Sequence, residues 1–294
     1  MSDERDELQK KIHALYAAEH AALGEQGALA QLEQARQWNL APLLRAGGVV
    51  IFPHAGVQDC GHQIAAAVHA ALDSGADTVL VVSVLHAFTN EMEQARRRVA
   101  AGGDPRQEIH WGIQGPGLAG REEWRGDHAL ISWRFFWEIE TKRRGLSAAK
   151  TPRVIERYPY HAAGHPDQLP GIEELIEIAK NAVIVSTADP FHHGIGYGNT
   201  PEESLPPDQN GLALARRRIQ EGIDILAAGD YWGYNQHCVS AKSDARDAGQ
   251  VYRYLRGPMK GSIHDLVYTD ATQLYAAPPP TWVAGALIGW ELSA

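Results

Sequence analysis

GGVVIFPH, residues 47–54, is a short apolar run rich in β-branched side chains that begins with two glycines and ends in proline and histidine. Such a run, closed by Pro53, predicts a buried strand over residues 47–52. A helical pattern follows over residues 64–72, and TVLVVSV, residues 78–84, predicts a second buried strand. Strand, helix and strand in this order are typical of a right-handed β-α-β crossover between parallel strands.

The same alternation of strand and helix continues through the chain. AVIVST, residues 182–187, is a third strongly apolar run, and weaker strand patterns lie at residues 153–158 and 282–292. Further helices are expected at residues 127–143, 171–180, 212–228 and 248–255. We therefore predict an α/β fold of three layers, αβα, with a largely parallel central sheet and helices on both faces.

The N-terminal segment differs from this pattern. Residues 3–45 are rich in alanine, leucine, glutamate, glutamine and lysine, which favour helix, and Gly24 and Gly27 are expected to split it. We divide the chain into an N-terminal helical extension, residues 1–45, and a single α/β catalytic domain, residues 46–294. The helices of the extension are candidate packing surfaces for a homo-oligomer.

The composition argues against several classes of protein. The formal net charge is −9 at pH 7, whereas a nucleic-acid-binding surface needs an excess of basic residues. No apolar run reaches the roughly 18 residues that a transmembrane helix needs. The first eleven residues are too charged for a secretory signal, and two cysteines give no disulfide framework, so we expect a cytoplasmic protein.

Titratable side chains follow the buried strands at the points where these strands end. His54 comes just after the first strand, His86 after the second, and Asp189 with His192 and His193 after the third. The carboxyl ends of parallel strands meet at the edge of the sheet where ligands bind, so we expect these groups to lie close together. Neutral imidazoles bind zinc, copper, iron and nickel alike. The pattern therefore predicts a metal or acid–base site without choosing the metal.

Six short motifs lie in order along residues 45–292. They are Pro53-His54-Ala55-Gly56 with Gly61, Val84-Leu85-His86, Asp127-His128-Ala129, Ser186-Thr187-Ala188-Asp189-Pro190-Phe191-His192 with Gly194 and Tyr197, Asp230 after a helix, and VAGALI at residues 283–288. In this order they resemble the motifs of the Memo-like family, which shares its fold with the class III extradiol ring-cleaving dioxygenases of the LigB type. The N-terminal helices have no clear counterpart there.

The resemblance implies that His54 and His86 bind a metal ion. Memo-like proteins usually supply the third ligand from a Cys-Gly-Arg motif near the start of a late helix. Counted back from that helix, Asp244-Ala245-Arg246 aligns with the motif, which implies the set His54, His86 and Asp244, with Cys238 as the alternative. Two histidines and a carboxylate form the facial triad of non-haem Fe(II) oxygenases, so Fe(II) is the expected cofactor. A Cys238 ligand would favour zinc or copper.

The resemblance also implies an acid–base residue. In class III extradiol enzymes a histidine that does not bind the metal deprotonates the substrate hydroxyl. His192 occupies the matching position, with Asp189 close enough in sequence to orient it, and His193 is the rival. Histidine suits this role because its usual pKa lies near the working pH of enzymes. The candidates for substrate contact are His128, His193, Tyr197 and Arg246, the last of which could pair with a carboxylate.

From these residues we expect a non-haem Fe(II)-dependent dioxygenase that acts on an aromatic, phenolic or catecholic, small molecule with O₂. Two alternatives stay open. One is a metal-dependent hydrolase or lyase that uses a metal-bound water. The other is a non-catalytic Memo-like protein that binds a metal or a partner.

Overall fold

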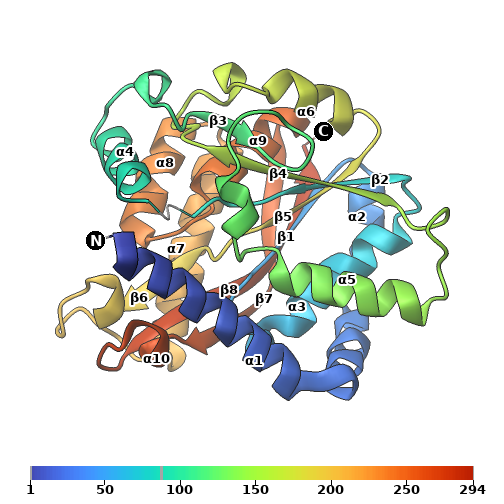
Figure 1. Cartoon of the computed structure of the whole chain (residues 1–294), viewed down its shortest axis with the longest axis horizontal. Coiled ribbons are helices and arrows are strands. Elements are labelled where there is room, and N and C mark those ends of the chain that lie inside the picture. Colours follow the sequence, from blue (N-terminus) through green and yellow to red (C-terminus); the bar gives the residue numbers. More distant parts are fainter. Residues whose placement is uncertain (1, 87–88, 294) are drawn as a thin grey trace.

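A mixed eight-stranded sheet lies at the centre of the structure, a computed structural model that describes residues 2–86 and 89–293 (Figure 1). Its strands are β1 Val49–Phe52, β2 Thr78–Val82, β3 Gly112–Gln114, β4 Arg153–Tyr160, β5 Val183–Thr187, β6 Phe191–Gly194, β7 Met259–Asp270 and β8 Thr281–Leu292. Four of them, in the order β4-β2-β5-β1, are parallel neighbours and form the middle of the sheet. The predicted α/β class and the parallel centre of the sheet are confirmed.

The strands of the first predicted β-α-β unit are parallel but are not neighbours. β5 lies between β1 and β2 and pairs with both. In this register Phe52, at the end of β1, pairs with Thr187, at the end of β5. The three strands therefore end at one edge of the sheet, and this edge receives the residues that follow them: His54, His86 and Asp189.

Antiparallel strands complete the sheet on both sides. β3 pairs with β4, while β8 pairs with β1, with β6 and, along nearly its whole length, with β7. The sheet is thus more mixed than the sequence predicts. β3, β6 and β7 have no counterpart among the predicted strands. The first two are only 3 and 4 residues long, and most side chains of β7 are partly exposed, so it lacks an apolar run.

Alternate side chains of the central strands face opposite sides of the sheet, and each side has its own core. On one side Val49, Ile51 and Leu80 pack with α6, α7, α8 and α9. On the other side Val50 and Phe52 pack with α1, α2, α3 and α5. The helices are α1 Ser2–Gln34, α2 Ala41–Arg45, α3 Val57–Asp73, α5 Ile131–Arg143, α6 Ile172–Ala179, α7 Gln209–Ala227, α8 Tyr231–Ala241 and α9 Arg246–Arg256. Helices thus flank the sheet on both faces, as predicted, which is compatible with a three-layer αβα fold.

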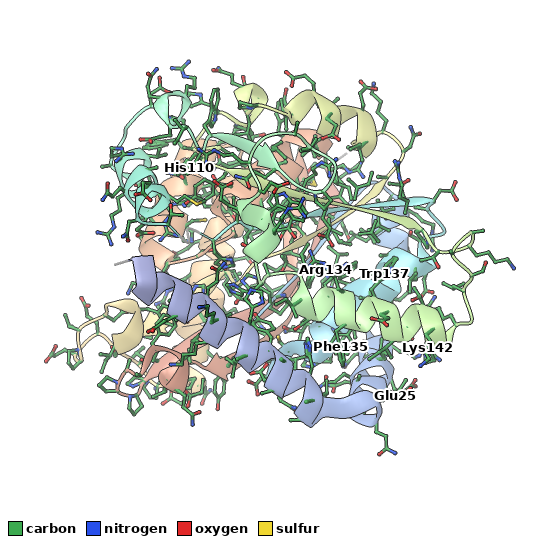
Figure 2. All side chains as sticks on the ribbon, viewed as in Figure 1. Glu25, His110, Arg134, Phe135, Trp137 and Lys142 are labelled. Atoms are coloured by element: carbon green, nitrogen blue, oxygen red, sulfur yellow. The ribbon has the colours of Figure 1, made fainter. Side chains whose placement is uncertain are left out.

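The N-terminal extension packs on this body rather than standing apart from it. α1 runs across α3 and α5 (Figure 1). It is interrupted at Gly24 (φ 60°, ψ −178°), as predicted, whereas Gly27 keeps helical geometry. The ring of Phe135 on α5 stacks on that of His20, with centroids 4.2 Å apart, while Glu25 extends away from the body (Figure 2).

Two further helices pack against each other: α4 Asn90–Ala100, which contains the basic run Arg96-Arg97-Arg98, and α8, which the sequence patterns did not predict. Both begin with a side-chain cap. Thr89 Oγ1 accepts a hydrogen bond from Met92 N–H at 3.1 Å, and Asp230 Oδ1 accepts one from Gly233 N–H at 2.7 Å. The motif residue Asp230 is therefore a helix cap. None of the helices that the described residues form is both long enough and apolar enough to cross a membrane.

Candidate metal centre

His54 lies two residues beyond the end of β1, and its side chain is buried. Its Nδ1 lies 3.1 Å from Thr187 Oγ1, and its backbone N–H donates to Asp189 Oδ1 at 3.0 Å. Its Nε2 faces two carboxylates, at 3.1 Å from Asp244 Oδ2 and 3.5 Å from Asp189 Oδ2. The Tyr16 hydroxyl donates to the His54 carbonyl. The ring is thus held at Nδ1 and presents Nε2 to the carboxylates.

His86 follows β2 and is held by Asp127. Its backbone N–H donates to Asp127 Oδ2 at 2.9 Å, and its Nδ1 lies 3.1 Å from the same oxygen. Its Nε2 lies 3.8 Å from Asp244 Oδ2. A carboxylate on the far nitrogen is the usual outer contact of a metal-binding imidazole. Asp127 is not among the predicted site residues, although its place beside His128 in a motif is a usable signal.

Among the described residues, two groups of side chains have donor atoms close enough together to hold a metal ion: His54, His86 and His128, and His54, Asp189 and Asp244. Within each group the donor atoms lie within 4.8 Å of one another. Asp244 Oδ2 links the groups, because it lies 3.1 Å from His54 Nε2 and 3.8 Å from His86 Nε2. Donor atoms about 2.1 Å from one ion lie about 3.0–3.4 Å apart. Asp244 Oδ2 is therefore near this spacing from His54 Nε2 and slightly beyond it from His86 Nε2, and the predicted set His54, His86 and Asp244 is split between the two groups of described residues.

The carboxylates of this site face imidazoles rather than basic side chains. Among the described side chains, no arginine or lysine forms an ion pair with Asp127, Asp189 or Asp244. Burial disfavours the charged form of His86, but Asp127 and Asp244 outweigh burial and raise its pKa to about 10. Burial also opposes the charged form of His54, yet Asp189 and Asp244 raise its pKa. Such a site stabilises added positive charge, which a metal ion supplies.

The three aspartates differ in acidity. Burial alone would raise the pKa of Asp127, but His86 outweighs it and lowers that pKa to about 2. The same balance, with His54 and His86 as the opposing groups, lowers the pKa of Asp244. For Asp189 the effect of burial on the pKa exceeds the opposing effect of His54, so its pKa is raised. Asp127 and Asp244 therefore stay ionised at neutral pH, as a metal ligand and its supporting carboxylate must.

His128 joins the site from the segment that leads into α5. Its ring stacks on the ring of His86, with centroids 4.1 Å apart, and lies 5.7 Å from the ring of Tyr16. Burial, reinforced by His86, holds the pKa of His128 well below its usual value, so this ring is neutral. Tyr16 belongs to the N-terminal extension, so this segment contributes to the site. No motif in the sequence marks Tyr16 as a site residue.

The two adjacent histidines of β6 point in different directions. His192 lines the cavity described below, and its Nδ1 is buried without a hydrogen-bond partner among the described residues. His193 does not line that cavity. Its Nε2 accepts a hydrogen bond from Leu205 N–H at 3.0 Å, and its ring packs against those of Phe191 and Trp282. Of the two rivals, His192 is the histidine that a bound molecule could reach.

The partner that orients His192 is not the one expected. The Asp189 carboxylate faces His54, through the backbone N–H and Nε2 of that residue. The His192 ring lies near the backbone of Lys242, which, like Asp244 and Asp189, favours its charged form. Burial lowers the pKa of His192 against the opposing effect of Asp244, so the ring is neutral and carries one free acceptor nitrogen.

A cavity of about 900 Å³ opens onto these groups. Its wall contains the titratable site residues His54, His86, His128, Asp189, His192 and Asp244. The expected substrate contacts Tyr197 and Arg246 also line it, and the Tyr197 ring lies 4.8 Å from that of His192. α1 contributes Ile12 and Tyr16. Small-molecule sites commonly have volumes of about 300–1,000 Å³, so the cavity suits a small organic ligand.

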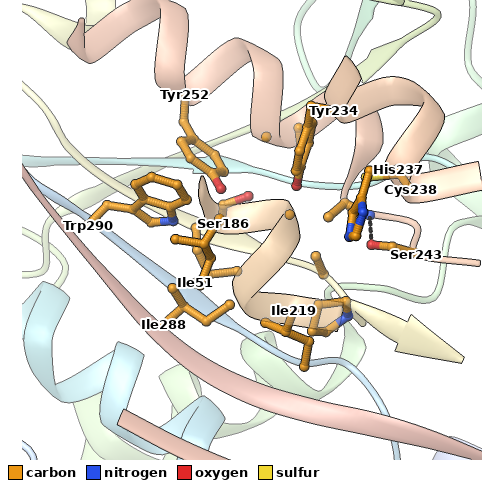
Figure 3. Close-up of a pocket in the computed structure, with 17 residues that line it drawn as sticks. Ile51, Ser186, Ile219, Tyr234, His237, Cys238, Ser243, Tyr252, Ile288 and Trp290 are labelled. Atoms are coloured by element: carbon orange, nitrogen blue, oxygen red, sulfur yellow. Dashed lines mark hydrogen bonds between the residues drawn. The ribbon is translucent and has the colours of Figure 1, made fainter. Parts of the chain in front are cut away.

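Cys238 lies on α8 between this cavity and a second one of about 30 Å³ (Figure 3). The second cavity has room for little more than one water molecule. Burial raises the pKa of the Cys238 thiol to about 12. Cys238 belongs to neither of the two groups of donor atoms found among the described residues. Of the two alternatives for the third ligand, Asp244 is the one that faces His54 and His86.

Comparison with known proteins assigns no family to this chain. No protein-family model matches it, and no curated protein sequence is significantly similar to it. Fold and site therefore define a class: an α/β protein with a mixed central sheet flanked by helices, with histidine and aspartate groups that could hold a metal ion at one sheet edge.

Proposed function

We propose that this chain is a non-haem Fe(II)-dependent dioxygenase of the extradiol type, which opens the ring of a catecholic small molecule. The observation that carries the proposal is the position of Asp244 Oδ2, 3.1 Å from His54 Nε2 and 3.8 Å from His86 Nε2. Two histidines and one carboxylate are the facial triad of non-haem Fe(II) oxygenases. When bound there, Fe(II) supplies open positions at which the catechol and O₂ are held together.

The surroundings of this donor set support a divalent cation. Thr187 and Asp127 hold the Nδ1 sides of His54 and His86, which directs both Nε2 atoms toward Asp244. The carboxylates lack basic partners among the described side chains, so a cation would complete the charge balance. The order of short motifs that resembles the Memo-like and LigB-type proteins is a second, weaker support.

His192 is proposed to move the protons. Its ring is neutral and lines the cavity, so it can accept a proton at a ring nitrogen. A catechol hydroxyl that reaches the ring from the cavity can transfer its proton to it. In the overall reaction both atoms of O₂ enter the product and the ring bond beside one hydroxylated carbon breaks.

The test is reconstitution of the purified full chain with Fe(II) under anaerobic conditions, followed by O₂ uptake with a panel of catechols. The expected result is about one iron per chain and consumption of one O₂ per catechol, with a ring-opened product by mass spectrometry. Retention of no iron together with no O₂ uptake on any catechol would reject the proposal.

A metal-dependent hydrolase or lyase is the second candidate, and the position of Asp189 favours it. Its Oδ2 lies 3.5 Å from His54 Nε2, and burial raises its pKa, as in a carboxylate that takes a proton from metal-bound water. Turnover by the Zn(II)-loaded chain without O₂ would select this candidate. A chain that binds metal but turns over no ester, amide or catechol would select the non-catalytic Memo-like role.

A further inference from the structure

Several basic side chains line the large cavity. Its cationic wall consists of Arg96 and Arg97 from α4, and of Lys242 and Arg246, which stand two residues before and two residues after Asp244. This wall contrasts with the carboxylates of the metal centre at the same cavity. It also contrasts with the formal net charge of −9 of the whole chain.

Few carboxylates balance the cationic wall. Arg96 and Arg97 share the carboxylate of Glu93, at 2.6 Å and 3.1 Å. Lys242 Nζ donates to the neutral amide oxygen of Asn199 at 2.5 Å and has no carboxylate within ion-pair distance among the described residues. Among the described residues, the cationic wall thus has more basic side chains than carboxylates. The basic side chains with the least compensation are Lys242 and Arg246, which flank Asp244 in the sequence.

Arg246 is the member of the wall with the least compensation. Its side chain is only 14% exposed, and its nearest carboxylate oxygen, Asp247 Oδ2, lies 3.9 Å from Nε. The other oxygen of Asp247 already accepts the Ala162 N–H at 2.8 Å. No described residue accepts a hydrogen bond from the Arg246 guanidinium. Its neighbour His161 is neutral, because burial and Arg246 lower the pKa of that imidazole to about 3.

The Arg246 guanidinium lines the cavity without a close anion, and a planar carboxylate is the group that its two parallel N–H donors fit best. We infer that the substrate of the proposed reaction carries a carboxylate, which binds Arg246 while the rest of the molecule faces His54, His86 and Asp244; Lys242 adds positive charge to the same cavity. This inference rests on the proposed function only in calling the bound molecule a substrate. The carboxylate site itself is argued from the charges of the cavity wall and does not depend on the reaction.

The test compares two probes of nearly the same shape and different charge: dihydroxybenzoate, as the 2,3 and 3,4 isomers, and the corresponding dihydroxybenzamides. Binding to the full chain is measured by calorimetry without O₂, so that no turnover is needed. We expect at least one acid to bind about tenfold to hundredfold more tightly than its amide. Arg246→Gln should remove this preference, Arg246→Lys should keep part of it, and added salt should weaken it.

The matched control is Arg106→Gln, since Arg106 is paired with Asp104 at 2.8 Å and does not line the cavity. This variant should keep the full preference. If Arg246→Gln does not fold, Lys242→Met should reduce the preference severalfold. Equal binding of acid and amide, no binding of either acid, or an undiminished preference in a folded Arg246→Gln chain would overturn the inference.

These outcomes separate the inference from the proposed function. An acid preference that depends on Arg246 in a chain that consumes no O₂ supports the carboxylate site and counts against the dioxygenase. Equal turnover of dihydroxybenzoate and dihydroxybenzamide by the Fe(II)-loaded chain supports the dioxygenase and rejects the carboxylate site.

Discussion

Two buried clusters of charged residues in this molecule are assembled in opposite ways. Around Glu140, on α5, the carboxylate is fully buried and every charge has a close partner. Arg143 Nε and Arg144 Nε each lie 2.6 Å from a carboxylate oxygen, and His69 Nδ1 lies 3.3 Å away. At the metal centre, Asp189 and the partly exposed Asp244 face imidazoles, with no basic ion-pair partner among the described side chains.

The difference indicates what each cluster does. The charge of a buried carboxylate between two guanidinium groups is already balanced. Such a cluster holds α5 and its neighbours in place and has no need of a ligand. Carboxylates that converge on imidazoles at the wall of a large cavity leave negative charge for a cation to balance. We therefore expect changes in the Glu140 cluster to affect stability, and changes at the metal centre to affect metal content and turnover.

The largest effect is expected from Asp244→Ala. Loss of its carboxylate removes the atom that links His54 and His86, so metal affinity should fall at least about 100-fold and O₂ uptake should reach background. The measurement is metal content after dialysis against a chelator. Cys238→Ala is the matched control and should retain its metal. The reverse pattern, with metal lost only from the cysteine variant, would assign the third ligand to Cys238.

Replacement of His192 should separate turnover from metal binding. His192→Gln is expected to lower kcat by about 100- to 10,000-fold with metal content unchanged, because the proton acceptor is lost and the ligands remain. His193→Gln is the matched control on the same strand, and its kcat should change less than fivefold, since His193 contacts Leu205 and not the cavity. A larger kcat loss in the His193 variant would exchange the roles of the two histidines.

Glu140→Gln tests the role of the Glu140 cluster in stability. Loss of this charge leaves two arginines without their shared partner, and breaking a buried ion pair typically costs about 3–5 kcal/mol of unfolding free energy. Urea unfolding at pH 7 measures the loss. Metal affinity of the folded variant should stay within about twofold of the parent chain. A Glu140→Gln chain that keeps the parent's unfolding free energy but loses its metal would contradict the assignment of stability to the Glu140 cluster and of metal binding to the metal centre.

Asp127→Asn probes the outer contact of the metal centre. The amide still fills the space but holds His86 Nδ1 less strongly, so metal affinity should fall about 10- to 100-fold. Asp265→Asn is a suitable control, because Asp265 holds His62 at 2.9 Å in the same type of pair but does not line the cavity. Equal metal loss in both variants would mean that the effect comes from general destabilisation.

The smallest expected effect is the pH dependence of the stability that the Glu140 cluster contributes. Burial raises the pKa of Glu140, but Arg143 and Arg144 outweigh it and lower that pKa below its unfolded value of about 4.3. The carboxylate therefore contributes stability above that pH and loses it as the pH falls through the folded value. The stability gap between the parent and Glu140→Gln chains should narrow when urea unfolding is repeated below pH 4. A gap that stays constant would show that Glu140 does not titrate with a lowered pKa.

Much of the fold follows from local patterns in the chain. The apolar runs at residues 47–52, 78–84 and 182–187 predict three buried strands, and the structure contains β1, β2 and β5 at these places. A run of β-branched residues with both faces buried has few alternatives to a central strand. Strand order does not follow from local patterns. β5 lies between β1 and β2 and pairs with residues more than 100 positions away in the chain. The edge strand β7 leaves no apolar run because its side chains are partly exposed.

Local sequence predicts that His54, His86 and Asp189 stand at the ends of central strands, because each follows an apolar run. Their partners come from distant parts of the chain. Asp127 holds His86 from 41 residues away, and Thr187 holds His54 from 133 residues away. The physical reason is that burial and strand formation depend on neighbours in the chain, whereas the direction of an imidazole nitrogen depends on strand order, register and side chains that folding brings together.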